Sequence, residues 1–183
     1  EQQIRESHLY QFRERLRADH DVPGDTFSAL HNWTVSHLEE FWEGAWVDAT
    51  DKTPAGAVLA DPSMPPSGRL DREVWFPGTR FNFARQLLGH RGDRIAIIEE
   101  NELGQSRTVN FQDLHLLTGR CQAALRRVGV GPGDCVAGYL SNTLETVVAM
   151  LATASLGAVW SATSPDFGFQ GVFNRFRQIN PKV

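Results

Sequence analysis

The chain has few cysteines, no excess of basic residues and no hydrophobic run typical of a membrane span. Its two cysteines, Cys121 and Cys135, are too few for a disulfide framework and do not form a CxxC pair. They predict ordinary thiols in a reducing, cytoplasmic setting. Lys and Arg number 18 against 22 Asp and Glu. Without a basic stripe, a nucleic-acid partner is not supported.

The longest uncharged stretch runs from Thr146 to Pro165. It has the length of a membrane span. However, Gly157 interrupts it and six of its residues are Ser or Thr. The stretch therefore predicts a buried helix followed by a buried strand, and we expect no membrane partner.

Motifs of catalytic or metal chemistry are not visible. The histidines are scattered, and none has a second ligand at a metal-binding spacing. No serine stands in a GxSxG elbow. The glycine-rich segment 129–133 leaves a predicted helix and enters a predicted strand, whereas a nucleotide-binding loop does the reverse. It predicts a helix stop and a turn, and we expect no catalytic residue and no metal ligand.

The signals for secondary structure change near residue 75. Over residues 1–75 we expect a helical extension with a wrapping loop. Leu9, Phe12 and Leu16 recur at spacings of three and four, which predicts one amphipathic helix over 3–17.

A second helix is expected to start at Ser36, whose hydroxyl caps the first turn while Glu39 reaches back to it. Aromatic residues then share one face of this helix and predict a packing surface: Phe41, Trp42 and Trp46. Residues 51–72 lack an apolar period and predict a loop. After the loop, one helix face is expected to carry four apolar residues: Phe81, Ala84, Leu87 and Leu88.

Over residues 76–183 strand and helix signals alternate. Apolar runs predict strands at 94–98, 107–109, 135–140 and 158–161, and Gly104 favours a hairpin between the first two. The intervening helices are expected to begin at capping residues and end at glycines: Asn110 and Asn142, Gly129 and Gly157. Helical crossovers imply parallel strand pairing, so the predicted fold class is α/β, a parallel sheet with flanking helices.

Ligands of such sheets bind beyond the carboxyl ends of the strands. The segments in question are Ser141–Asn142 and 162–169. The second contains Ser164, Asp166 and Gly168. Read as a pattern alone, an Asp-capped turn before a helix over 170–177 explains it at least as well as a ligand loop.

Three long segments resemble one known family. They are VAMLATASLGAVWSATSPDFG (148–168), TRFNFARQLL (79–88) preceded by WFPG, and GVGPGDCVAGYLSN (129–142). They resemble the acetoacetyl-CoA synthetases, which are acetoacetate:CoA ligases of the adenylate-forming superfamily. The helix from Ser36 to Trp46 is similar to the leading extension of their acetyl-CoA synthetase relatives.

The resemblance implies a reaction in two halves, with ATP, Mg²⁺ and CoA as co-substrates. Acetoacetate attacks ATP to give an acyl adenylate and pyrophosphate, and the CoA thiol then displaces AMP. In relatives, the loop matching Ser164 to Gly168 lies near the channel for the pantetheine arm of CoA. Carried over, this makes Asp166 and Gly168 neighbours of that channel.

Family members also use a Ser/Thr/Gly-rich phosphate loop, adenine and ribose contacts and a lysine of a mobile C-terminal domain, and residues 1–183 contain none of these motifs. We therefore expect residues 76–183 to be the first part of a truncated AMP-binding domain, inactive alone and self-associating through an open sheet edge. Two alternatives stay open: another short-chain acyl-CoA synthetase, or a stand-alone α/β binding module without catalysis.

Overall fold

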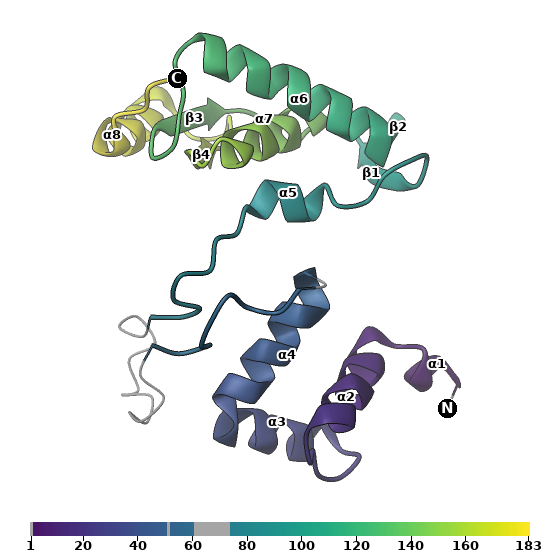
Figure 1. The fold of residues 1–183 in the computed structure, drawn as a ribbon. Coiled ribbons are helices and arrows are strands. Elements are labelled where there is room, and N and C mark those ends of the chain that lie inside the picture. The colour runs from purple at the N-terminus through teal and green to yellow at the C-terminus, as the bar shows by residue number, and fades with distance from the viewer. Residues whose placement is uncertain (1, 51, 61–73) are drawn as a thin grey trace. The chain divides into compact units, whose positions relative to one another are not determined.

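The computed structural model describes residues 2–50, 52–60 and 74–183 and separates the chain into two compact units, Glu1–Arg80 and Phe81–Val183 (Figure 1). The first unit is helical, and the second combines helices and strands, in agreement with the predicted α/β class. Most of the loop expected over 51–72 lies outside the described residues. No helix in the described parts of the chain is long and apolar enough to cross a membrane.

The described residues of the first unit form four helices: α1 Gln2–Arg5, α2 His8–Asp19, α3 Phe27–Ser36 and α4 Leu38–Thr50. The single helix predicted over 3–17 is therefore wrong, because Ser7 adopts an extended backbone and caps α2 by accepting a hydrogen bond from Tyr10 N. The core of the unit is formed by four buried residues: Leu16, Val22, Leu30 and Trp33.

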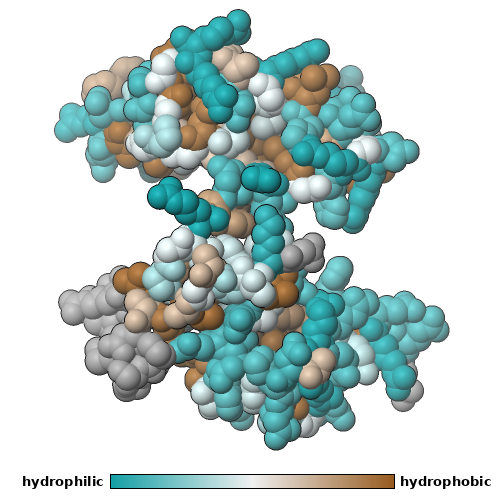
Figure 2. Space-filling view, in the orientation of Figure 1, coloured by the Kyte–Doolittle hydropathy of each residue, from teal (hydrophilic) through white to brown (hydrophobic). Residues whose placement is uncertain are grey.

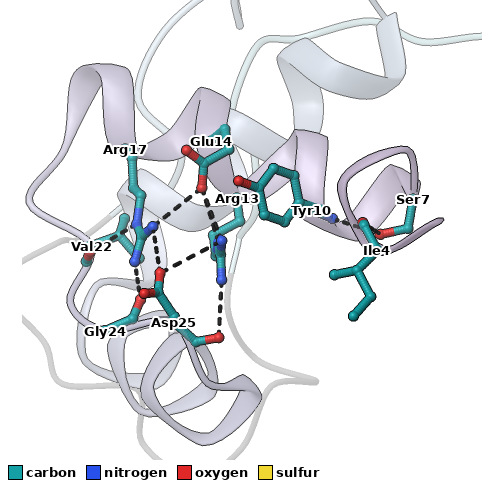
Figure 3. A network of polar contacts seen from close by, with 9 residues as sticks. All are labelled: Ile4, Ser7, Tyr10, Arg13, Glu14, Arg17, Val22, Gly24 and Asp25. Atoms are coloured by element: carbon teal, nitrogen blue, oxygen red, sulfur yellow. Dashed lines mark hydrogen bonds and ion pairs between the residues drawn. The ribbon is translucent and has the colours of Figure 1, made fainter. Parts of the chain in front are cut away.

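The turn between α2 and α3 is closed by arginines of α2 (Figure 3). Arg17 pairs with Asp25 at 2.9 Å and donates to the carbonyl of Gly24, while Arg13 lies 3.7 Å from the same carboxylate. Glu14 accepts from both arginines. Hydrogen bonds to Asp25 and Glu14 raise the pKa of Arg17 above its usual value. The carboxylates of Glu14 and Asp25 are exposed, whereas the two arginine side chains are partly buried. Because water screens the carboxylates, these pairs fix the path of the turn more than they add stability.

Ser36 does not cap the second predicted helix. It is the last residue of α3, which the sequence did not predict, and its hydroxyl donates to Asn32 O at 3.0 Å inside that helix. The helix after it, α4, starts at Leu38. The spacing of Ser36 and Glu39 looked like a capping box because a helix C-terminus and the next N-terminus are separated here by His37 alone.

The aromatic residues of α4 pack, as expected, on the chain that follows. The Trp42 and Trp75 rings lie 5.6 Å apart, and the Trp46 and Phe76 rings lie 4.8 Å apart. Trp75 is also held by an isolated antiparallel bridge to Leu59. The stripe is thus a packing surface within the first unit.

The second unit contains four helices and four strands: α5 Phe83–Leu87, β1 Ile95–Glu100, β2 Ser106–Asn110, α6 Phe111–Arg127, β3 Cys135–Tyr139, α7 Leu144–Ser155, β4 Val159–Thr163 and α8 Phe169–Ile179. β1 and β2 form the expected antiparallel hairpin, and β3 and β4 pair in parallel in one register from Cys135↔Val159 to Tyr139↔Thr163. The described strands form two separate two-stranded sheets. The crossover through α6 therefore does not pair β2 with β3.

Local signals placed most ends of these elements. Asn110 Oδ1 accepts from Asp113 N at 2.7 Å and caps α6, and Gly129 and Gly157 end α6 and α7 with positive φ. At α7 the prediction was wrong by one residue, since Thr143 and not Asn142 occupies the N-cap.

Two apolar clusters surround α7. One joins it to α5, the hairpin and α6, and the other joins it to α6 and β3. Ala84 and Leu88 are buried in the first cluster, but Phe81 and Leu87 are about half exposed. The predicted four-residue face is thus only half right, because α5 is a single short turn. On the face in Figure 2, hydrophilic and hydrophobic residues are interspersed over both units.

Candidate functional site at the carboxyl ends of β3 and β4

The ends of β3 and β4 meet at one edge of their sheet (Figure 1). The pairing continues one step past the strands, where Leu140 N donates to Thr163 O at 3.2 Å. Two segments leave this edge, Ser141–Asn142 toward α7 and 164–168 toward α8. The sequence predicted these segments as the place where a ligand would bind. They lie at the same edge because the two strands pair in parallel.

Tyr139, the last residue of β3, holds the second segment in place. Its hydroxyl lies 2.9 Å from the carbonyl oxygen of Pro165 and 3.0 Å from that of Phe167. Because a phenol has one proton to donate, the Tyr139 hydroxyl donates to one of these two carbonyls at a time. The 164–168 loop is therefore fastened to the neighbouring strand and not only to its own ends.

A tight turn shapes the loop itself. Ser164 Oγ donates to Asp166 Oδ2 at 2.6 Å and accepts from Asp166 N at 3.3 Å, and Phe167 N donates to Ser164 O at 3.2 Å. Asp166 remains exposed. One carboxylate oxygen is engaged by the serine, and the other is free to accept from a ligand.

Gly168 is the N-cap residue of α8, and no side chain caps this helix. Asp166 bonds to Ser164 within the turn before α8 and not to the first turn of that helix. Gly168 has an ordinary φ of −60°, and a Cβ on it would meet no atom within 4 Å. The space in front of the Gly168 backbone is therefore open.

Phe167 lies under a cation. The Arg175 guanidinium carbon is 4.3 Å from the centroid of the Phe167 ring, and the same group donates to Gly171 O at 3.0 Å. This cation–π contact favours one position of the Phe167 ring relative to α8, the helix that carries Arg175. It adds a positive charge beside the Asp166 turn.

Near the end of β3, the Trp160 ring packs on Gly138. A Cβ on Gly138 would lie 2.6 Å from the Trp160 ring, a distance that real Cβ atoms do not show. The indole of Trp160 thus fills the place of the missing side chain.

This edge offers hydrogen-bond groups but no reactive machinery. It presents the Asp166 carboxylate and backbone groups around Gly168. The hydroxyl of Thr163 is buried and has no partner among the described residues. No cluster of three or more His, Cys, Asp or Glu residues fit for a metal occurs in the part of the chain that the structure describes. The arrangement suits contact with a polar ligand arm, with the chemistry supplied elsewhere.

Tyr139 and Arg175 were not predicted from the sequence as residues of this site. Tyr139 is the next-to-last residue of the strand predicted over 135–140. That position is a usable signal, because ligands of parallel sheets bind beyond the carboxyl ends of the strands. Arg175 gave no signal, since its contact with Phe167 depends on where the turn places the ring.

Comparison with known proteins gives consistent results. The family described as AMP-binding enzyme matches residues 83–183. The acetoacetyl-CoA synthetase of Xenopus tropicalis is 40% identical over 176 residues, which are 94% of this chain and 26% of that protein. A malonamoyl-CoA synthetase, vrtB, of Penicillium aethiopicum is 34% identical over 183 residues, 96% of this chain and 25% of that protein.

Among solved structures, an acetoacetyl-CoA synthetase from Streptomyces lividans superposes with a TM-score of 0.85 at 36% identity. The superposition covers 98% of this chain and 28% of that one. The chain spans about a quarter of the length of the curated relatives it matches. The resemblance stated from the sequence and the α/β class are confirmed.

Proposed function

The chain belongs to the family of AMP-binding enzymes, and we propose that it is part of an ATP-dependent acid–thiol ligase that makes acetoacetyl-CoA. The reaction converts acetoacetate, ATP and CoA to acetoacetyl-CoA, AMP and pyrophosphate through an acyl adenylate. The observation that carries the proposal is the superposition on an acetoacetyl-CoA synthetase over 98% of the chain, which includes the helical first unit as well as the family-matched segment.

We place the boundary between the helical extension and the AMP-binding domain near residue 75. The extension would then run over residues 1–75 and the domain over 76–183. The proposed location is the cytoplasm, and the proposed setting is lipid and fatty acid metabolism, where acyl thioesters of CoA are the activated form of the acid.

Within this function, Asp166 and Gly168 border the path of the pantetheine arm of CoA. Three properties support this assignment. Both residues are exposed, both follow a parallel strand at its carboxyl end, and Tyr139 holds their loop in a defined position. The open space in front of Gly168 suits a narrow chain passing along the backbone, and the Asp166 carboxylate accepts from its amide groups.

The acid is expected to be short and to carry a carbonyl at its third carbon. Acetoacetate and malonamate, the acids in the names of the two relatives above, share this group and differ in the methyl or amino group beyond it. Acetoacetate is the first choice, because the relative named for it is the more similar of the two, and another short acid is the alternative.

The test has two proteins. The complete product of the gene that encodes this chain is incubated with ATP, Mg²⁺, CoA and either acetoacetate or malonamate, and pyrophosphate release is followed. The 183-residue chain is assayed beside it. We expect turnover with acetoacetate by the complete protein and none by the chain, because donors around the transferring phosphates are needed for adenylation.

Each other outcome has a clear meaning. Turnover by the 183-residue chain overturns the view that the catalytic groups lie outside it. Turnover of malonamate alone keeps the ligase and replaces the acid. A stop codon directly after Val183 favours the stand-alone binding module over the ligase.

The CoA assignment is tested in the complete protein with Asp166→Asn and Gly168→Val. We expect a raised KM for CoA with little change in the KM for ATP. Glu102→Gln, a change at an exposed residue in the turn between β1 and β2, is the matched control and leaves both constants unaltered.

A further inference from the structure

The second unit contains a pocket of about 410 Å³ bounded by α5, α6 and the last residue of α7. It lies away from the Asp166 loop. α7 starts just beyond β3 and is 12 residues long, so its last residue, Ser155, is about 18 Å from the edge where β3 and β4 end. The pocket is therefore a separate feature of the unit.

Its lining carries positive charge from two arginines, Arg85 and Arg91. His115 also lines it, and none of the described residues that line it is Asp or Glu. The guanidinium groups of Arg85 and Arg91 make no hydrogen bond or ion pair with any described residue. Two unpaired guanidinium groups beside one pocket repel each other, and an anion between them removes the repulsion.

Other residues that line the pocket are polar and hydrogen-bonded to one another. Gln122 Nε2 donates to Ser155 Oγ at 2.7 Å, and Ser155 Oγ donates to Ala152 O at 2.6 Å. Thr118 also lines the pocket, is 2% exposed, and its hydroxyl has no partner among the described residues. A buried hydroxyl without a partner is unfavourable, and a ligand in the pocket is a natural partner for it.

Gly119 keeps this space open. It lies in the middle of α6, where glycine weakens a helix relative to alanine, and a Cβ on it would meet no atom within 4 Å. Any larger side chain here would project into the pocket.

We propose that this pocket binds the phosphate group of a small anion. Each guanidinium presents a planar fork of donors that matches phosphate oxygens, and two of them balance the roughly −1.5 to −2 charge of a phosphate monoester at neutral pH. The volume is within the range of roughly 300–1,000 Å³ usual for small-molecule sites, so the rest of the ligand also fits.

The test is a calorimetric titration of the 183-residue chain at constant ionic strength. Inorganic phosphate, phenyl phosphate and CoA are titrated, and acetate is the anion control. We expect saturable binding of phosphate and phenyl phosphate, and much weaker binding of acetate. Competition by CoA identifies its phosphate as the source of the group, and absence of competition identifies a separate small ligand. Absent phosphate binding, or equal affinity for acetate, overturns the proposal.

Variants then assign the binding to this pocket. Arg85→Gln and Arg91→Gln should each weaken phosphate binding by about tenfold, the scale of one charge-assisted pair. Arg120→Gln removes the same charge from an exposed residue of α6 outside the lining and should leave affinity unchanged. Equal weakening by Arg120→Gln would mean that only net charge matters and would overturn the assignment.

Three further variants separate binding from folding. Gly119→Leu fills the pocket and should abolish binding, while Gly119→Ala, with only one added carbon, keeps it. Thr118→Val removes the unpartnered hydroxyl at nearly constant volume. It should weaken phosphate binding several-fold while leaving the thermal midpoint of the free chain unchanged or higher. Full binding by both Gly119→Leu and Thr118→Val, each folded by circular dichroism, would place the anion elsewhere.

Discussion

The hydroxyl of Tyr139 lies 2.9 Å from the carbonyl oxygen of Pro165 and so ties the end of β3 to the loop that follows β4. The residues are 26 positions apart in the chain. The same hydroxyl lies 3.0 Å from the carbonyl oxygen of Phe167, so Tyr139 contacts the loop on both sides of Asp166.

Removing this link should loosen the loop without unfolding the unit. Tyr139→Phe keeps the ring and removes one hydrogen bond. Because the Tyr139 side chain is about half exposed, we expect the unfolding free energy to fall by about 1 kcal/mol or less. We expect faster hydrogen exchange at the amide of Phe167, while amides of α6 keep their protection. Unchanged exchange at Phe167 would show that the turn is held by Ser164 alone.

The close approach of Gly138 to Trp160 predicts a different response. Gly138→Ala places a carbon 2.6 Å from the indole and should destabilise the unit by about 1–3 kcal/mol, as over-packing of a core does. Gly119→Ala is the matched control, since open space surrounds its added carbon, and it should stabilise the chain by up to about 1 kcal/mol. Urea unfolding measures the change in unfolding free energy for each variant. The prediction would be refuted if both variants were stabilised or both were destabilised relative to the parent.

Acid should weaken the link between the chain's last residues and the turn before β3. Lys182 Nζ donates to Asp134 Oδ2 at 2.9 Å, and this bond, followed by one from Gly131 N, lowers the pKa of Asp134. Because the pKa of Asp134 is lower in the folded chain than in the unfolded chain, its ionised form stabilises the fold at pH values above the unfolded pKa of about 3.9. This stabilisation disappears as the pH falls through the folded-state pKa.

The corresponding variant is Lys182→Met. It should be less stable than the parent at pH 7. It should also lose less stability between pH 5 and 2, because the pKa of Asp134 is lowered less when the Lys182 bond is absent. Lys52→Met, on the exposed surface of the first unit, serves as the control. Thermal midpoints across this pH range check the prediction, and parallel curves for parent and Lys182→Met would contradict it.

We propose that the chain associates with itself through the free edge of β4. One edge of β3 carries Lys182 and Val183, whose backbone bonds to Cys135 and Ala137 at 2.8 Å, and its other edge carries β4. No second strand pairs with β4 within the ranges described above. An unpaired strand edge is a template for another chain.

Sedimentation velocity at rising concentration tests this proposal. Val159→Lys places a charge on the exposed start of β4 and should reduce association, whereas Val128→Lys, at an exposed position after α6, should not. A strictly monomeric parent at the highest concentration would rule the edge contact out.

Signals between near neighbours predicted a large part of the second unit. The hairpin followed from two short apolar runs across Gly104, the start of α6 from Asn110 three residues before Asp113, and the ends of α6 and α7 from Gly129 and Gly157. In each case the groups that bond or turn are within a few residues of one another. The same reliance on short spacing misled the interpretation of Ser36 and Glu39, because α3 precedes them. That helix has a local cap at Thr26 and is also packed through Leu30 and Trp33 into the core of the first unit.

The amino-acid order alone therefore determined the α/β class, the strand–helix alternation and the segment that carries Asp166 and Gly168, because periodicity, caps and turns act locally. Tertiary structure decided which strands pair, that Tyr139 fastens the loop, and that Arg85, Arg91 and Thr118 meet at one pocket. These contacts join residues separated by tens of positions. Their geometry depends on how α5, α6 and α7 pack, which no short spacing in the chain encodes.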